Sequence, residues 1–140
     1  MDKCARILVV EDNEDNRRLL GIYLRREGYD VVEVTDGVEA MAKALAEPFD
    51  LICSDVQMPR MDGYTLCRRL KENPATEQIP IILITAVHTT VEDTLEGLQV
   101  GANDFLSRPF RQSELLARVR TQLRIKELRD RLVQAERVAT

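Results

Sequence analysis

The sequence predicts an α/β domain in which helices cover both faces of a doubly wound, five-stranded parallel sheet. Two observations carry this prediction. Short runs rich in valine, isoleucine and leucine alternate along the chain with segments of helical spacing. Several of these runs are almost continuously apolar, as is typical of strands that are covered on both faces. Strands that alternate with helices are joined by right-handed crossovers, which gives a parallel sheet.

Five apolar runs are the expected strands, and most of them lead to a polar or charged side chain. They are residues 7–10 before Glu11 and Asp12, 31–34, 51–53 before Asp55, 79–84 before Thr85, and 104–106 before Arg108. In a parallel sheet the carboxyl ends of the strands share one edge, and such folds place their sites there. These side chains are therefore expected to lie close together.

Five segments in which apolar residues recur every three or four positions are the expected helices. Their apolar faces include Leu20 and Leu24, Met41 and Leu45, Leu66 and Leu70, Val91, Leu95 and Leu98, and Leu116, Val119 and Leu123. Gly28 is expected to close the first helix, and Pro74 follows the end of the third. The fourth is expected to begin at Thr89 and Thr90 and to end before Gly101.

Composition and charge narrow the class of function. With 44% hydrophobic residues the chain can bury a core, and it has neither a membrane-length apolar stretch nor a signal region, so we expect a cytoplasmic protein. From Arg111 onward there are eight basic and four acidic residues, a net +4, which leaves −8 on the rest. An acidic body is a poor binder of nucleic acid. Cys4, Cys53 and Cys67 form no CxxC pair and are expected to be reduced thiols.

Three carboxylates, those of Glu11, Asp12 and Asp55, are expected at the shared edge. Like charges this close are costly unless a cation joins them, and Mg²⁺ suits such a pocket of hard oxygen ligands. Asp12 and Asp55 are the best direct ligands. A backbone carbonyl near Gln57 is a candidate third ligand, and Glu11 is expected to act through a water molecule.

The same arrangement makes Asp55 a candidate nucleophile for a phosphoryl group. Mg²⁺ and the nearby Arg108 can offset the charge that the group brings. The hydroxyl of Thr85 can bond one phosphoryl oxygen, and backbone N–H groups after Asp55 can hold another. The chain is therefore expected to be a phosphoacceptor rather than an enzyme, with at most self-phosphorylation from small donors and auto-dephosphorylation.

Five motifs in this order resemble the receiver domain of response regulators in two-component signalling. They are Glu11-Asp12-Asn13, Ser54-Asp55-Val56-Gln57-Met58-Pro59, Met61-Asp62-Gly63, Ile84-Thr85-Ala86, and Phe105-Leu106-Ser107-Arg108-Pro109-Phe110. The match covers about residues 5–123 and implies a flavodoxin-like (βα)5 sheet of order 2-1-3-4-5. We expect a receiver domain over residues 1–123.

The resemblance also implies partners and a switch. Asp55 would receive phosphate from a sensor histidine kinase or a histidine phosphotransfer protein. Thr85 and Phe105 would then couple the phosphate to the face formed by the fourth helix, the fifth strand and the fifth helix. The family often has Tyr where this chain has Phe105. It has Lys where this chain has Arg108, and it implies a cis bond between Arg108 and Pro109.

Residues 124–140 are expected to form a helical linker or coiled-coil extension of the last helix. A stripe with alternating spacings of three and four residues runs along it, made of Ile125, Leu128, Leu132, Ala135 and Ala139. Its phase differs from that of Leu116, Val119 and Leu123, so it is expected to face a partner, as in a homodimer. The last residues resemble the lead-in to the dimerising helix of sensor kinases, which suggests a longer, hybrid kinase-like protein or a fused effector.

Three alternatives can be weighed. A receiver-like dimerisation scaffold that does not switch is motivated by Arg108. A phosphatase of the haloacid dehalogenase kind would need an Asp-x-Asp loop after the first strand, and a nucleotide-binding domain would need a glycine-rich turn there. The sequence has Glu11 and Asp12 at that place instead. His88 is expected to be a solvated loop residue, because no carboxylate neighbours it.

Overall fold

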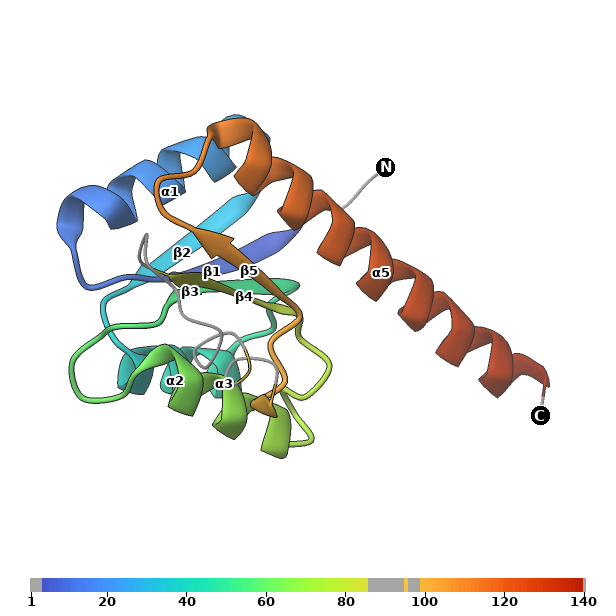
Figure 1. Ribbon diagram of the computed structural model, residues 1–140. Helices are drawn as coiled ribbons and strands as arrows, with labels where there is room; N and C mark the ends of the chain where they lie inside the picture. The colour runs from blue at the N-terminus through green and yellow to red at the C-terminus, as the bar shows by residue number, and fades with distance from the viewer. Residues whose placement is uncertain (1–3, 86–94, 96–98, 140) are drawn as a thin grey trace.

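The computed structural model describes residues 4–85, 95 and 99–139, which form a parallel sheet between two layers of helices (Figure 1). The strands are β1 (Arg6–Val10), β2 (Asp30–Val34), β3 (Leu51–Asp55), β4 (Ile81–Thr85) and β5 (Asp104–Ser107). Their order is β2-β1-β3-β4-β5, and each neighbouring pair is parallel. The predicted fold class and strand order are confirmed.

The helices in the described part of the chain lie on both faces of the sheet. They are α1 (Glu14–Arg26), α2 (Gly37–Ala46), α3 (Gly63–Glu72) and α5 (Gln112–Ala139). In Figure 1, α1 and the start of α5 lie above the sheet, and α2 and α3 lie below it. The fourth helix predicted between Thr89 and Gly101 falls mostly outside the described residues, as does His88.

Side chains alternate between two cores along each strand. In β1, Ile7 and Val9 belong to the core under α1 and α5, whereas Leu8 and Val10 belong to the core over α2 and α3. All four side chains have no exposed surface. Burial on both faces explains why these strands read as continuous apolar runs. Cys53 and Cys67 are buried and free, and burial raises the pKa of the Cys53 thiol to about 12.

Local signals set most of the element ends. Asn13, Asp36 and Asp62 cap α1, α2 and α3 by accepting a backbone N–H from within the first turn. Gly28 closes α1 with φ of 90°, as predicted. The fourth strand starts at Ile81, not at Ile79 as predicted, and Pro80 stands between them. A proline has no N–H to give to a sheet, so the pairing begins after it.

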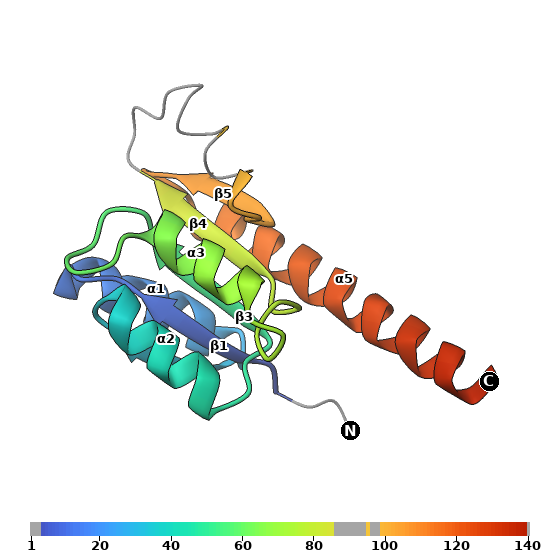
Figure 2. The same cartoon turned by 90° about the horizontal axis from the view of Figure 1, so that it is seen from below.

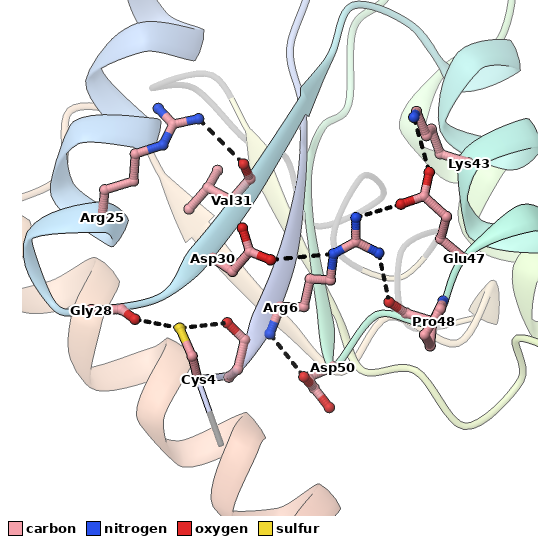
Figure 3. A network of polar contacts seen from close by, with 11 residues as sticks. Cys4, Arg6, Arg25, Gly28, Asp30, Val31, Lys43, Glu47, Pro48 and Asp50 are labelled. Atoms are coloured by element: carbon pink, nitrogen blue, oxygen red, sulfur yellow. Dashed lines mark hydrogen bonds and ion pairs between the residues drawn. The ribbon is translucent and has the colours of Figure 1, made fainter. Parts of the chain in front are cut away.

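Arg6 joins several elements at the amino-terminal edge of the sheet, opposite the carboxyl ends of the strands (Figure 3). Its guanidinium forms ion pairs with Asp30 at 3.4 Å and with Glu47, and it lies 4.7 Å from the centre of the Phe49 ring. Its backbone N–H donates to Asp50 Oδ2 at 2.8 Å. The first residue of β1 is thereby fixed to β2, to the end of α2 and to the start of β3.

The last helix, α5, continues well beyond the sheet (Figures 1 and 2). Near its middle it still contacts the body, because Lys126 Nζ lies 3.6 Å from Asp50 and Arg129 donates to Gln78 at 3.1 Å. The side chains of Ile125, Leu128 and Leu132 are 43%, 48% and 66% exposed. These three members of the predicted stripe are therefore exposed and lie outside the two cores.

Candidate functional site: an acidic cluster at the strand ends

The carboxyl ends of β1 and β3 bring three carboxylates together. Glu11 follows β1, and its backbone N–H donates to the carbonyl of Val34 at 3.1 Å. Asp55 is the last residue of β3. One oxygen from each of Glu11, Asp12 and Asp55 lies within 4.8 Å of the others. Glu11 and Asp55 are buried and Asp12 is exposed, so the cluster opens to solvent on one side.

The turn into α1 orients Glu11. The backbone N–H of Asn13 donates to Glu11 Oε2 at 3.2 Å, and Asn13 itself caps α1 by accepting the N–H of Asn16 at 2.9 Å. On the other side, Arg17 Nη1 donates to the carbonyl of Glu11 at 3.0 Å. The buried carboxylate is therefore held by the first turn of the helix that follows it.

Arg108 brings a positive charge to the same cluster. Its Nη1 lies 3.2 Å from Asp55 Oδ1, and its Nη2 pairs with Glu11 Oε1. Its backbone N–H donates to the carbonyl of Thr85 at 2.9 Å, which carries the β4–β5 pairing one step further. The bond between Arg108 and Pro109 is cis, as predicted. One guanidinium thus bridges two of the three carboxylates.

Burial changes the acidity of Glu11. Removal from water, with a further contribution from the negative charge of Asp55, raises the pKa of Glu11 from 4.5 to about 7. Arg108 and the N–H of Asn13 act in the opposite direction but do not cancel this effect. The ionised form of Glu11 is therefore unfavourable in the folded protein near neutral pH.

Glu11→Gln is expected to stabilise the metal-free protein. Because the folded pKa lies above the ordinary value, ionised Glu11 opposes folding, and this penalty is absent below pH 4.5 and complete above about pH 7. We expect the variant to raise the free energy of unfolding by about 2 kcal/mol near pH 8 in EDTA, and hardly at all near pH 4. Urea unfolding measures both values. Glu14→Gln, an exposed site in α1, is the control, and an equal gain there would contradict the explanation.

The loop after Asp55 forms the open wall of the site. Gln57, Met58 and Pro59 line one shallow depression together with Glu11, Asp12, Asn13, Asn16 and Asp55. The N–H of Val56 already donates to the carbonyl of Ile84 at 3.1 Å. A backbone N–H that could donate to a phosphoryl oxygen must therefore lie further along the loop. Gln57, near which a carbonyl ligand is predicted, thus lines the same depression as the acidic cluster.

The two predicted switch residues lie on neighbouring strands. Thr85, at the end of β4, is 5% exposed, and its Oγ1 lies 3.5 Å from Ser107 Oγ on β5. Phe105 pairs with Leu83 in the sheet and packs, half-buried, against the core over α2 and α3. The structure thus places Thr85 at the same sheet edge as Asp55, with Phe105 two residues before the end of β5.

Some contacts at the site were not predicted from the sequence. The pairing of Arg108 with Glu11 joins residues that are 97 positions apart, and no local sequence pattern predicts it. The role of Asn13 as helix cap and as donor to Glu11 could have been found, because an Asn before a helical segment is a typical cap. The predicted constellation is otherwise assembled at one edge.

Comparisons with known proteins agree with this geometry. Residues 7–120 match the family model of the response regulator receiver domain. The response regulator PleD of Caulobacter vibrioides is 48% identical over 132 residues, which are 94% of this chain and 29% of PleD. The transcriptional regulator RpaA of Synechocystis is 40% identical over 85% of this chain and 49% of its own length. The chain therefore spans less than half of the length of each of these relatives.

Solved structures give the same result. The chemotaxis protein CheY4 of Vibrio cholerae has a TM-score of 0.80 at 34% identity, covering 85% of this chain and 98% of that one. The receiver domain of a sensor histidine kinase from Pseudomonas aeruginosa, which has a magnesium ion coordinated in its active site cleft, has a TM-score of 0.80 at 33% identity. It covers 86% of this chain and 98% of its own.

Within the described residues, no helix is both long and apolar enough to cross a bilayer. The chain belongs to the family of response regulator receiver domains, which act as phosphorylation-activated switches in two-component signalling.

Proposed function

We propose that Asp55 is the phosphoacceptor of this receiver domain and takes its phosphoryl group from a histidine kinase or a histidine phosphotransfer protein. The observation that carries the proposal is the convergence of Glu11, Asp12 and Asp55 at one sheet edge, with Arg108 bridging two of them. A buried carboxylate with a cation beside it can attack phosphorus, and the acidic neighbours supply ligands for a metal ion.

Magnesium fits the acidic cluster. Three carboxylate oxygens lie within 4.8 Å of one another, and hard oxygen ligands with room for water are what Mg²⁺ prefers. Burial, and after it the negative charge of Asp55, raises the pKa of Glu11, and a divalent cation in the cluster would favour the charged form of both carboxylates. We assign Asp12, Asp55 and the carbonyl of Gln57 as direct ligands, with Glu11 acting through water. The magnesium ion in the active site cleft of the Pseudomonas relative supports the choice of metal.

Three side chains, those of Asp55, Arg108 and Thr85, would each have a separate role in the phosphoryl transfer. An oxygen of Asp55 bonds to phosphorus while the bond from phosphorus to the imidazole nitrogen of the donor breaks, and the imidazole takes up a proton. Arg108, 3.2 Å from Asp55 Oδ1, can donate to the phosphoryl oxygens as charge moves onto them. Thr85 would donate its hydroxyl to another. When bound, Mg²⁺ would offset part of the negative charge of the phosphoryl group.

The proposal is tested by labelling with a small acyl phosphate. In the presence of Mg²⁺, the intact mass of the protein is expected to rise by one phosphoryl group, and hydroxylamine should remove it, as for an aspartyl phosphate. EDTA should prevent the gain. No gain in mass at saturating donor and Mg²⁺ would reject phosphorylation at this site.

Arg108→Lys tests the alternative of a scaffold that does not switch. The guanidinium of Arg108 pairs with Glu11 and Asp55 at the same time. The ammonium of a lysine is a single point charge, so it would compete less with a metal ion for these carboxylates. We expect wild type to label readily and the lysine variant to bind Mg²⁺ about threefold to tenfold more tightly. Calorimetric titration measures the affinity. If wild type does not label and the Arg108→Lys variant does, the scaffold is favoured.

We also propose that residues 1–123 are the receiver domain and that residues 124–140 are a linker that pairs two copies. The exposure of Ile125, Leu128 and Leu132 supports it, because large apolar side chains at heptad spacing on a projecting helix need a partner. In the whole protein, this linker would pass the state of a cytoplasmic receiver to a fused kinase or effector module.

Two charges in the stripe should abolish that pairing. Leu128→Glu combined with Leu132→Glu is expected to turn a dimer into a monomer in sedimentation velocity, with a loss of affinity of about a hundredfold or more. Val133→Glu is the matched control, because Val133 is 43% exposed but lies off the stripe. A wild-type monomer at high concentration would contradict the dimer.

A further inference from the structure

The loop after Asp55 is tied to the start of α2 by two contacts. Arg60 donates from Nε to Asp36 Oδ2 at 3.1 Å, and its Nη2 reaches the same oxygen. Next to this pair, the backbone oxygen and the Cβ of Met61 lie 2.7 and 2.8 Å from the place where a Cβ on Gly37 would stand. Adjacent residues of the β2–α2 turn and of the β3–α3 loop therefore touch.

Arg60 adopts a backbone conformation that its side chain disfavours. Its φ is 67°, in the left-handed region that glycine occupies readily and other residues seldom do. Strained residues of this kind persist where surrounding contacts hold them, and they gather at functional sites. The contact with Asp36 is such a restraint, because the ion pair requires the side chain of Arg60 to leave the loop in this direction.

Asp36 is a rigid anchor for this contact. Its side chain is only 8% exposed. Its Oδ1 accepts the backbone N–H of Glu39 at 2.9 Å and so caps α2, while Oδ2 receives Arg60. These contacts hold the pKa of Asp36 below its ordinary value, with the N–H of Glu39 as the largest cause. The carboxylate is therefore charged and fixed when it receives the guanidinium.

The loop is held at its other end as well. The N–H of Gly63 donates to the carbonyl of Val56 at 2.8 Å, and Gly63 lies directly against the backbone of Asp55. Between these two attachments lies Gln57, whose carbonyl we assign to the metal. The position of that carbonyl thus depends on how both ends of the loop are fixed.

We propose that the Asp36–Arg60 ion pair is a positioning clamp that holds residues 56–62 in the conformation that binds Mg²⁺. The inference rests on the proposed metal site. Neither residue is a ligand, and both act through the loop. By linkage, Mg²⁺ strengthens the clamp by the same factor by which the clamp strengthens Mg²⁺ binding.

A double-mutant cycle on the full chain tests the clamp. Asp36→Asn keeps a capping side chain, and Arg60→Asn places a residue that tolerates the left-handed conformation. Each single variant is expected to weaken Mg²⁺ binding about fivefold in calorimetric titration, and the double variant no more than either. Arg60→Lys should recover part of the loss. Asp30→Asn removes an ion pair at the opposite edge and should leave the affinity unchanged.

The same variants separate a positioning role from a structural one. If the variants lower only the unfolding midpoint in EDTA and leave Mg²⁺ affinity unchanged, or if the two losses add, the clamp is overturned while the metal site stands. If wild type itself does not bind Mg²⁺, the proposed metal site is rejected and the clamp with it. A stronger coupling between Asp36 and Arg60 in Mg²⁺ than in EDTA supports the clamp.

Discussion

Asp55→Asn is expected to abolish labelling of the protein by a small acyl phosphate, with the rate falling by about a hundredfold or more. The amide has nearly the shape of the carboxylate but is a far weaker nucleophile. Arg108 keeps its pairing with Glu11, and the negative charge that raises the pKa of Glu11 is gone. The fold is therefore expected to survive, so the loss reports chemistry. Mass spectrometry of the intact protein measures it.

The matched control is another carboxylate close to the site. Asp15 lies exposed in the first turn of α1, after the turn that carries Glu11 and Asp12. Asp15→Asn should label at the wild-type rate, because an exposed charge there is largely screened by salt. Label that persists in Asp55→Asn would move the phosphoacceptor elsewhere. If both variants lose the label, the negative charge of this surface as a whole, rather than one nucleophilic carboxylate, determines the rate of labelling.

Gly63→Ala is expected to destabilise the protein by about 3 kcal/mol and to disturb the phosphoacceptor at the same time. A Cβ at this position would lie 2.4 Å from the carbonyl oxygen of Asp55 and 2.9 Å from the Cα of Val56. Both are backbone atoms at the end of the buried strand β3, so they cannot move aside without a large cost in free energy. The gain in helix propensity from alanine, at most about 1 kcal/mol, is too small to compensate.

Gly21→Ala provides the comparison within the same fold. Gly21 lies inside α1, and the three atoms nearest to a Cβ there belong to the ends of the side chains of Arg25 and Glu33, which are flexible. We expect the free energy of unfolding to change by no more than about 1 kcal/mol, because alanine favours the helix and the Arg25–Glu33 ion pair can adjust. Urea unfolding measures both variants, and labelling should slow only in Gly63→Ala. Equal stability of the two variants would mean that α3 can retreat from Asp55 without cost.

The local pattern of residues was enough to predict the sheet and the edge that carries the chemistry. Strands covered on both faces are apolar throughout, and the residue that follows each strand then stands out as polar. This pattern predicts that Glu11, Asp55 and Thr85 lie together, and the register of β1, β3 and β4 agrees. The Asp62 cap and the closing Gly28 are equally local, because each acts within one turn of its own helix.

Tertiary structure alone decided which side chains meet across loops. The pairing of Arg108 with Glu11 and that of Arg60 with Asp36 join residues 97 and 24 positions apart, and both depend on loop conformations that no periodic pattern encodes. The acidity of Glu11 likewise follows from burial beside Asp55. Periodicity reports which face of an element is apolar, whereas the direction of a polar side chain at a loop is set by the packing of distant segments around it.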